Sequence, residues 1–267
     1  MQIENHPVNS GKMPSEEKKA LIGTAGWNIP KTESLFFPVE GSHLERYSST
    51  LNCVEINSSF YRNHLPKTYN RWANTVPDHF LFSVKLLQRF THEQRLAADP
   101  AQLEATLTGI LGLGSKLGVI LVQLPPSLTF DSPTAGHFFT KVRKHYEGPL
   151  VLEPRHFTWT SEQAKKLLKA FMVTKARADP EPCPVSTPEA WESGLSYFRL
   201  HGSPEIYRSK YGHGFLQSLQ IMLEGRAAPA WCVFDNTTFG HAWANAVELK
   251  KRLEEKRGAA QSTPMAG

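Results

Sequence analysis

Cysteine is scarce in this sequence of 267 residues, and long apolar runs are missing altogether. Cys53, Cys183 and Cys232 lie far apart and form no CxxC pair. This spacing excludes a disulfide framework and a cysteine zinc cluster, so we expect free thiols. No apolar run reaches the roughly 18 residues of a membrane span, and no apolar signal segment stands at the N-terminus. We therefore expect a cytoplasmic protein with no membrane partner.

Acidic residues are outnumbered by basic ones, 25 to 30, which gives a net charge of +5 and a pI near 9.0. This balance admits a nucleic acid or a phosphorylated small molecule as partner. Much of the positive charge lies in Glu16–Ala20 and Glu248–Arg257, where it mixes with acids as on a solvated helix face. The distribution therefore favours a solvated surface over a nucleic-acid-binding one and leaves the remaining cations to be explained.

Polar segments stand at both ends of the chain, and we expect flexible tails at 1–19 and 258–267 around one domain at 20–257. Between them, apolar runs alternate with amphipathic segments, which is typical of a parallel sheet with helical crossovers. We expect strands within Leu21–Trp27, Cys53–Phe60, Phe80–Leu86, Leu117–Pro125, Pro149–Arg155, Val173–Ala178, Leu195–Gly202 and Ala230–Asn236. We expect helices at Pro66–Thr75, Pro100–Ser115, Pro133–His145, Ser161–Met172, Phe215–Gly225 and Gly240–Glu255.

The polar residues inside these runs follow a repeating pattern. In the stretch VEINSSFYR (Val54–Arg62), alternation along a strand places Val54 and Ile56 on one face and Glu55 and Asn57 on the other. The third, fifth, seventh and eighth runs alternate in the same way, and their polar residues stand near the C-terminal end. One face of the predicted sheet is therefore apolar throughout, and the other becomes polar only at one end.

This pattern predicts a closed barrel. An open sheet covered by helices on both faces would bury the charged groups, at several kcal/mol for each unpaired charge, roughly. A barrel opens the same groups to a mouth at the C-terminal ends of its strands. We therefore predict an α/β fold with a single (β/α)8 TIM-type barrel. The residues expected at its mouth are Glu55, Asn57, Lys85, Gln123, Glu153, Arg155, Arg199, His201 and Asp235.

Several motifs together resemble one known family. In chain order they are IGTAGW (Ile22–Trp27), VEINSSFYR, FSVK (Phe82–Lys85), TH with RL (Thr91, His92, Arg95 and Leu96), QLPPS (Gln123–Ser127), LEPRHFTW (Leu152–Trp159), YFRLHG (Tyr197–Gly202) and FDNTTFGHAWANA (Phe234–Ala246). They resemble the YecE-like family, a domain of unknown function with a TIM-barrel fold that is loosely compared with sugar isomerases. The resemblance covers about residues 21–253. It implies the same fold and adds Tyr61, His92, His156 and Asn236 to the expected site.

Three residues are candidates for catalysis. Glu55 and Glu153 could form an acid/base pair, because proton transfer at neutral pH needs a carboxylate whose pKa is tuned by its surroundings. The alternative is that each forms an interior salt bridge with an Arg or Lys. Lys85 could form a Schiff base if its pKa is lowered, or it could help to hold an anion as a cation.

The remaining site residues point to a small anionic ligand. Lys85, Arg155, His156, Arg199 and His201 would repel one another unless acids or an oxyanion compensate them, and arginine matches phosphate and carboxylate oxygens well. The alternative is that Glu55, Glu153 and Asp235 neutralise these cations internally. The amides of Asn57, Gln123 and Asn236 would orient hydroxyl groups, and Tyr61 could stack on a sugar or a base.

The histidines show no close metal-ligand spacing such as HExxH, and no motif for an organic cofactor is present. We predict no metal ligands, although a divalent metal stays open as an alternative. The sequence thus favours an enzyme that performs acid/base chemistry on a small phosphorylated or carboxylated sugar-like substrate. Two alternatives remain, a metal-dependent barrel that cleaves or repairs nucleic acid and a non-catalytic sensor of an anionic ligand. The substrate and the oligomeric state are left undetermined.

Overall fold

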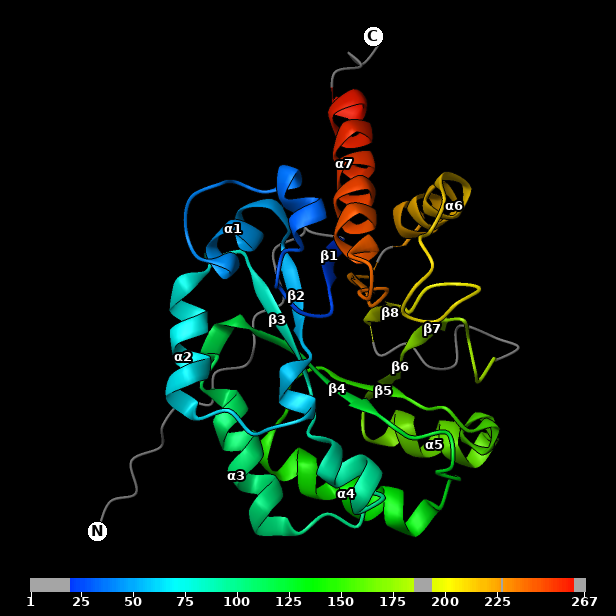
Figure 1. The fold of residues 1–267 in the computed structure, drawn as a ribbon. Helices are drawn as coiled ribbons and strands as arrows, with labels where there is room; N and C mark the ends of the chain where they lie inside the picture. Colours follow the sequence, from blue (N-terminus) through cyan, green and yellow to red (C-terminus); the bar gives the residue numbers. More distant parts are fainter. Residues whose placement is uncertain (1–19, 185–193, 227, 262–267) are drawn as a thin grey trace, which may run out of the picture.

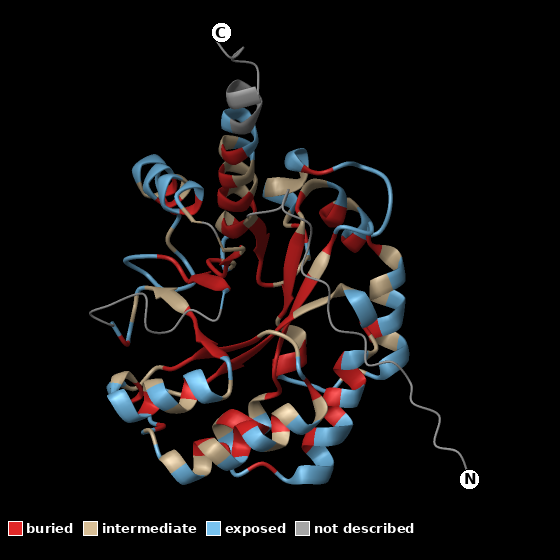
Figure 2. Ribbon diagram, turned by 180° about the vertical axis from the view of Figure 1, so that it is seen from behind, coloured by how far each residue is buried: buried red, intermediate tan, exposed pale blue. Residues whose placement is uncertain are grey.

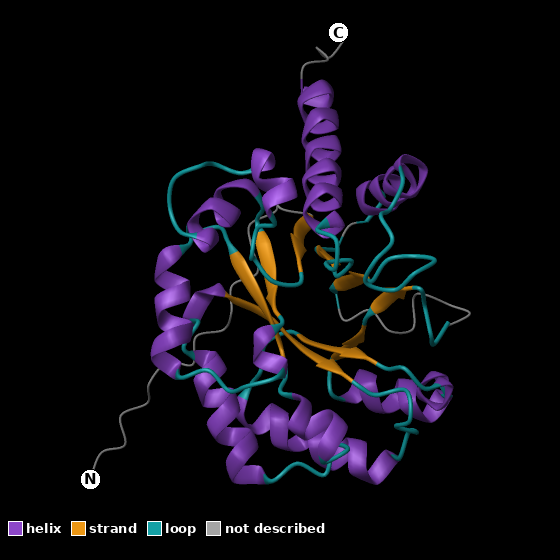
Figure 3. Ribbon diagram, viewed as in Figure 1, coloured by secondary structure: helices purple, strands orange, loops and turns teal. Residues whose placement is uncertain are grey.

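The computed structural model describes residues 20–184, 194–226 and 228–261 (Figure 1). The tail predicted at 1–19 lies outside this range. The strands lie in the middle of the molecule and the helices lie around them (Figure 3). Buried residues concentrate in the strands and on the helix faces that cover them, whereas the outer faces of the helices are exposed (Figure 2).

The strands form two parallel sheets. One sheet has the order β1 (Ala20–Thr24), β9 (Ala230–Phe234), β8 (Ser196–Leu200) and β7 (Arg177–Asp179). The other has the order β2 (Cys53–Ile56), β3 (Leu81–Lys85), β4 (Leu117–Gln123), β5 (Leu150–Glu153) and β6 (Val173–Lys175). All pairs within the sheets are parallel. The prediction of an α/β fold with parallel strands is therefore confirmed, while the strands hydrogen-bond as two sheets instead of one continuous eight-stranded sheet.

Helices connect most successive strands. They are α1 (His43–Thr50), α2 (Pro66–Thr75), α3 (Pro100–Leu111), α4 (Ser132–His145), α5 (Glu162–Ala170), α6 (His213–Glu224) and α7 (His241–Gln261). The sequence analysis did not predict α1, although Ser42 and Glu45 form a capping box at its start. Helix α7 continues to Gln261 and so enters the segment predicted as a C-terminal tail, of which 262–267 lie outside the described residues.

The two sheets adjoin one another at two places. Between β1 and β2, Ala25 bridges to Glu55, and the Gly26 amide donates to the Glu55 carbonyl at 2.9 Å. At the other place Ala176 alone separates β6 from β7, and its amide donates to the carbonyl of Leu152 on β5 at 2.7 Å. The sixth run, predicted as one strand, is therefore two short strands that belong to different sheets.

Gly23 is placed where β1 approaches β2 very closely. A Cβ atom on Gly23 would lie 2.1 Å from the carbonyl oxygen of Cys53, which is a backbone atom and cannot turn aside. We expect Gly23→Ala to lower the free energy of unfolding by about 1–3 kcal/mol because the strands must move apart. Urea unfolding measures this change. Gly136→Ala in α4 is the control, since a Cβ there meets only Leu167 at 3.8 Å, and it should change stability by less than about 1 kcal/mol. Equal stabilities of the two variants would contradict the tight approach of β1 to β2.

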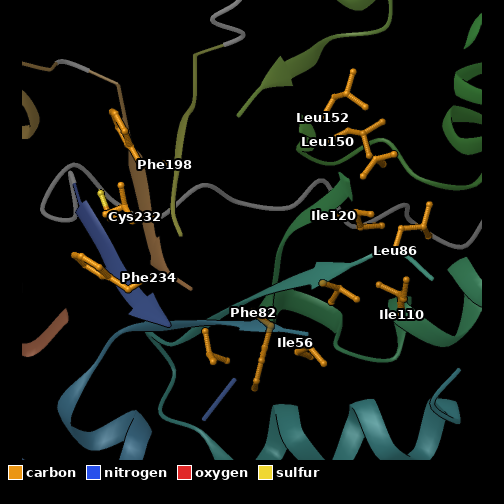
Figure 4. Packing of buried hydrophobic residues seen from close by; sticks show 14 of the residues in the cluster. Ile56, Phe82, Leu86, Ile110, Ile120, Leu150, Leu152, Phe198, Cys232 and Phe234 are labelled. Carbon is orange, nitrogen blue, oxygen red and sulfur yellow. The ribbon is translucent and has the colours of Figure 1, made fainter. Parts of the chain in front are cut away.

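Two apolar clusters lie on the two faces of the strands, as the alternation predicts. The outer cluster packs the strands against the helices and includes Phe82, Ile120 and Phe234 (Figure 4). The inner cluster draws side chains from both sheets. Its buried members are Leu21, Ala25, Cys53, Val119, Leu121, Val151, Ala176, Leu195, Tyr197, Trp231 and Val233.

Trp231 joins the two sheets inside this inner cluster. A Cβ atom on Gly118 of β4 would lie 2.4 Å from the indole ring of Trp231, which belongs to β9 in the other sheet. Only glycine leaves room for the ring at this position. Both residues stand near the N-terminal ends of their strands, so that end of the interior is filled with apolar atoms.

Candidate functional site

Polar side chains replace apolar ones where the strands end. We call this set the strand-end cluster, and each member stands at or next to the last residue of its strand. The members are Glu55, Lys85, Gln123, Glu153, Arg199, His201 and Asp235. All of them are buried. The structure thus brings together seven of the nine residues that alternation placed at the C-terminal ends, and the other two, Asn57 and Arg155, lie two residues beyond Glu55 and Glu153.

Arg199 lies between three carboxylates and is fully buried. Its Nε and Nη2 atoms donate to both oxygens of Glu55, at 3.0 and 2.8 Å. Nη1 donates to Glu153 Oε2 at 3.1 Å, and Nη2 lies 2.9 Å from Asp235 Oδ2. Burial by itself would lower the pKa of Arg199, but the three carboxylates outweigh it and raise that pKa well above its usual value. Arg199 is therefore charged at every accessible pH.

His201 is held by two of the same carboxylates. Its Nε2 lies 3.0 Å from Glu153 Oε1 and its Nδ1 lies 3.0 Å from Asp235 Oδ2. Both ring nitrogens can donate at once only in the protonated ring. Burial works against this charge, but Glu153 and Asp235 reverse its effect and raise the pKa of His201. His201 therefore acts as a second internal cation.

Glu153 accepts more contacts than the other carboxylates in the cluster. Gln123 Nε2 donates to its Oε1 at 3.0 Å, and Arg155 Nε lies 3.4 Å from the same oxygen. Burial alone would raise the pKa of Glu153, but Arg199, His201 and Arg155 hold it well below its usual value. Burial alone would also raise the pKa of Asp235, but Arg199 and His201 outweigh it and lower that pKa. These two groups are thus ionised at neutral pH and are weak bases.

Glu55 is positioned by a second layer of hydrogen bonds that the predicted site omitted. The Tyr197 hydroxyl lies 3.1 Å from Glu55 Oε2 and 2.8 Å from Ser83 Oγ. Both Tyr197 and Ser83 are buried. Alternation places them on the same strand face as Arg199 and Lys85, so this signal could have identified them.

Lys85 differs from the other charged members of the cluster. Its side chain is buried, with 5% of the residue exposed, yet among the described residues its ammonium makes no hydrogen bond or ion pair. The Nζ atom lies 4.0 Å from the centre of the Phe60 ring. Burial, with a further contribution from Arg199, lowers the pKa of Lys85 to about 8, although Glu55, Asp235 and Glu153 partly oppose the shift. Lys85 can therefore change its charge close to neutral pH.

Lys175 is a useful comparison because it is buried to the same extent, 5% exposed. Its ammonium donates to Glu181 Oε2 at 3.0 Å and to the Ala176 carbonyl at 3.3 Å. A structural lysine in this protein thus has partners, which distinguishes it from Lys85.

Three further residues lie near the strand ends, namely His92, Arg155 and Asn57. Each can carry a positive charge or has spare hydrogen-bonding capacity. Burial, together with the charges of Lys85 and Arg155, lowers the pKa of His92. Arg155 Nε and Asn57 Oδ1 are buried atoms that have no hydrogen-bond partner among the residues that the structure describes. His92 itself packs edge-on against Phe60, with ring centres 5.0 Å apart. The strand ends therefore combine several groups that favour an anion with atoms that lack a partner.

Three predicted residues have other contacts. His156 Nδ1 accepts from the Thr158 amide and so caps the turn η5 (Phe157–Thr160). Asn236 Nδ2 donates to the Ser209 carbonyl and to Asn245 Oδ1, at 2.9 and 3.0 Å, which ties the segment after β8 to α7. Tyr61 is 67% exposed and packs against Phe60 instead of joining the cluster.

One aromatic residue near the cluster had no signal in the sequence. Tyr207 packs edge-on against His201, with ring centres 5.6 Å apart, and adopts a positive φ of 68°. It stands in the segment between β8 and α6, where no periodic pattern predicts the position of a side chain. Tyr207 therefore joins the surroundings of the cluster as an unpredicted residue.

Within the described parts of the chain, no three His, Cys, Asp or Glu side chains are grouped so that they could hold a metal ion. The guanidinium of Arg199 lies between the three carboxylates instead. None of the helices in the same parts combines the length and apolar character needed to cross a bilayer.

The sequence is similar to known proteins. A family model described as "Protein of unknown function DUF72" matches residues 21–266. The UPF0759 protein YunF from Bacillus subtilis is 31% identical over 164 residues. That alignment covers 56% of this chain and 56% of YunF, so the match spans little more than half of the relative.

Two solved structures have a similar fold. A DUF72 family protein from Thermotoga maritima superposes with a TM-score of 0.73 at 24% identity, over 88% of this chain and 99% of its own. A DUF72 family protein from Enterococcus faecalis gives a TM-score of 0.72 at 20% identity, over 88% of this chain and 95% of its own. At these identities the likeness concerns the fold.

Proposed function

The chain belongs to the DUF72 family of proteins of unknown function, and we propose that it is an enzyme that acts on a small anionic, sugar-like molecule at the strand-end cluster. Lys85 is the group that exchanges a proton with the substrate. The observation that carries this proposal is that Lys85 is a buried residue whose ammonium makes no hydrogen bond or ion pair among the described residues.

The proposal includes a barrel fold of the TIM type for the domain at 20–257. The two sheets adjoin at Ala25 and at Ala176, and counting β6 and β7 as one interrupted strand gives eight strands around the inner cluster. The contact of Trp231 with Gly118 spans the interior between the sheets. In such a fold the C-terminal ends of the strands carry the reacting groups.

Proton transfer is assigned to Lys85 because an acid or base works best when its pKa is near the operating pH. Among the groups with shifted pKa values, Lys85 lies near 8, whereas Glu153 lies well below its usual value and Arg199 well above. We therefore revise the roles predicted for Glu55 and Glu153. They orient Arg199 and His201 instead of moving protons, which is the salt-bridge alternative that the sequence left open.

The anionic character of the substrate follows from the charges. Three carboxylates, Glu55, Glu153 and Asp235, face four positive groups, Arg199, His201, Lys85 and Arg155, so one positive charge is left over. Of these four positive groups, those of Lys85 and Arg155 make the fewest contacts with the carboxylates. A phosphate or carboxylate can accept from both. The amides of Asn57 and Gln123 then orient hydroxyl groups of the substrate.

A thermal-shift screen of metabolites tests the proposal, because a ligand that binds only the folded state raises the melting temperature. Phosphate esters and sugar acids are expected to dominate the hits, with shifts of about 5 °C at a hundredfold excess over Kd. Lys85→Met and Arg155→Gln should lose these shifts, whereas Lys175→Met should keep them. Hits restricted to neutral compounds, or shifts unaffected by Lys85→Met, would refute an anion site at Lys85.

A further inference from the structure

We propose that Lys85 is a nucleophile that forms a Schiff base with an aldehyde or ketone carrying a phosphate or carboxylate group. This inference rests on the proposed function, because it places the carbonyl carbon of the same anionic substrate at the Lys85 nitrogen. It narrows the substrate class to carbonyl compounds and adds a covalent step.

The contrast between the two buried lysines supports this role. Lys175 is as buried as Lys85, but its ammonium is matched by Glu181 and a backbone carbonyl. A charged lysine in a buried position costs free energy unless its ammonium is paired, and among the described residues the Lys85 ammonium has the face of the Phe60 ring but no hydrogen bond or ion pair. The Lys85 side chain is therefore poorly explained by a structural role and well explained by a reaction at its nitrogen.

The surroundings of Lys85 favour the uncharged amine that the reaction needs. Burial of the side chain and the nearby positive charge of the Arg199 guanidinium both lower the pKa of Lys85, although the Phe60 ring, whose centre lies 4.0 Å from Nζ, attracts the charged form. With a pKa of about 8, roughly a tenth of the Lys85 side chains are neutral at pH 7, far more than for an ordinary lysine with a pKa near 10.4. Desolvation beside another cation is a recognised way to activate a lysine nucleophile.

The backbone at Lys85 is fixed, so its amine has a defined position. The Ser59 hydroxyl donates to the Lys85 carbonyl at 2.7 Å, and Leu86 continues the chain with its amide donating to Leu121 at 2.8 Å. Both contacts hold the end of β3 against its neighbours. A nucleophile held in a fixed position reacts faster, because less freedom of motion is lost on the way to the transition state.

The chemical step balances with no added reagent. The neutral amine of Lys85 attacks the carbonyl carbon and forms a C–N bond, which gives a carbinolamine after its proton moves to the oxygen. Loss of the hydroxyl with the remaining amine hydrogen releases one water molecule and leaves an imine. The imine then takes one proton from solvent, and no electrons are transferred. Asn57 Oδ1, just after β2 and so beside β3, is a buried acceptor that no described residue satisfies, and it could accept from the carbinolamine hydroxyl.

Arg155 explains why the substrate should be anionic. Its Nε lies 3.4 Å from Glu153 Oε1 and has no hydrogen-bond partner in the described part of the chain, so it could donate to a phosphate or carboxylate oxygen. Arg155 and Lys85 both lower the pKa of His92, which places all three groups within electrostatic reach of one another. One small molecule could therefore contact Arg155 with its anionic group and Lys85 with its carbonyl.

Reductive trapping tests the inference. The full chain is incubated with glyoxylate, pyruvate or dihydroxyacetone phosphate in the presence of cyanoborohydride, which reduces an iminium to a stable secondary amine. At least one probe is expected to add its own mass less one oxygen atom to a single residue, which peptide mapping identifies as Lys85. Labelling should exceed that of any other lysine by at least tenfold, as its larger neutral fraction requires.

Matched variants separate this inference from the proposed function. Lys85→Arg keeps the positive charge, so it should retain thermal shifts with phosphate esters but form no adduct, while Lys175→Met should label normally. Absence of a Lys85 adduct with all three probes overturns the Schiff base. If Lys85-dependent thermal shifts persist in that case, the proposed function stands, and if they are also absent, both fail. Equal labelling by dihydroxyacetone, which lacks an anion, overturns the requirement for an anionic group.

Discussion

Arg199→Met is expected to lower the free energy of unfolding by about 3–5 kcal/mol, because removing one partner leaves buried charges without compensation. Glu55, Glu153 and Asp235 all contact the Arg199 guanidinium within 3.1 Å, and Arg199 is fully buried. Urea unfolding followed by circular dichroism at pH 7 measures the loss. Arg199→Lys should recover little of it, since an ammonium cannot contact both oxygens of Glu55 as a planar guanidinium does.

Arg252→Met is the matched control for this experiment. Arg252 lies 2.8 Å from Glu248 in α7, but the pair is partly exposed, so its loss should cost less than about 1 kcal/mol. The pH dependence gives a second check. Glu153 and Asp235 have lowered pKa values in the folded protein, so the stability they contribute is present above their ordinary pKa values and disappears as the pH falls. The gap between wild type and Arg199→Met should therefore shrink in acid, and a loss no larger than that of Arg252→Met would contradict the central role of Arg199.

Lys85→Met is expected to have the opposite effect and to raise the free energy of unfolding at pH 7 by up to about 3 kcal/mol. The pKa of Lys85 falls from 10.5 to about 8 on folding, and each unit corresponds to about 1.4 kcal/mol. Because the unfolded chain holds this proton more tightly than the folded protein does, keeping Lys85 charged costs the folded protein stability. This cost is present in full below about pH 8. It disappears as the pH rises toward 10.5. Urea unfolding at pH 7 and pH 10 measures the gap between the two proteins at each value.

Lys175→Met provides the contrast for Lys85. It should destabilise the protein, because it removes the ion pair with Glu181 and leaves that carboxylate without its cation. A Lys85→Met protein less stable than wild type at pH 7 would show that Lys85 has a structural role. A stability gap that stays constant between pH 7 and pH 10 would show that its ammonium does not cause the cost. The expected gain in stability would accompany a loss of ligand binding, as is common when a strained group serves function.

Alternation of side chains was enough to predict which face of each strand is polar, and so most of the strand-end cluster. It could not tell which cations are already neutralised. A pattern of faces does not distinguish Arg199 from Lys85 or Arg155. Only the folded protein shows that Arg199 contacts three carboxylates, whereas no described carboxylate forms an ion pair with Lys85. The ion pairs of Arg199 and His201 with carboxylates therefore argue against their predicted role in binding an anion. Lys85 and Arg155 remain candidates for that role.

The elements that the sequence misjudged have local causes. The sixth strand was predicted as continuous, but at Ala176 the chain changes from one sheet to the other, which periodicity does not record. His156 carried a family motif, yet its side chain caps a turn. Helix α1 was missed although Ser42 and Glu45 signal its start, because it is only 8 residues long and offers a short pattern to read. Such contacts depend on neighbours that the linear order does not reveal.

The packing of the Trp231 indole against Gly118 has a consequence for how a ligand reaches the strand-end cluster. If the strands form the proposed barrel, apolar side chains fill that end of its interior, so a ligand of Lys85 would enter and leave at the C-terminal ends of the strands. For the proposed enzyme we therefore expect the product to compete with the substrate for the same site.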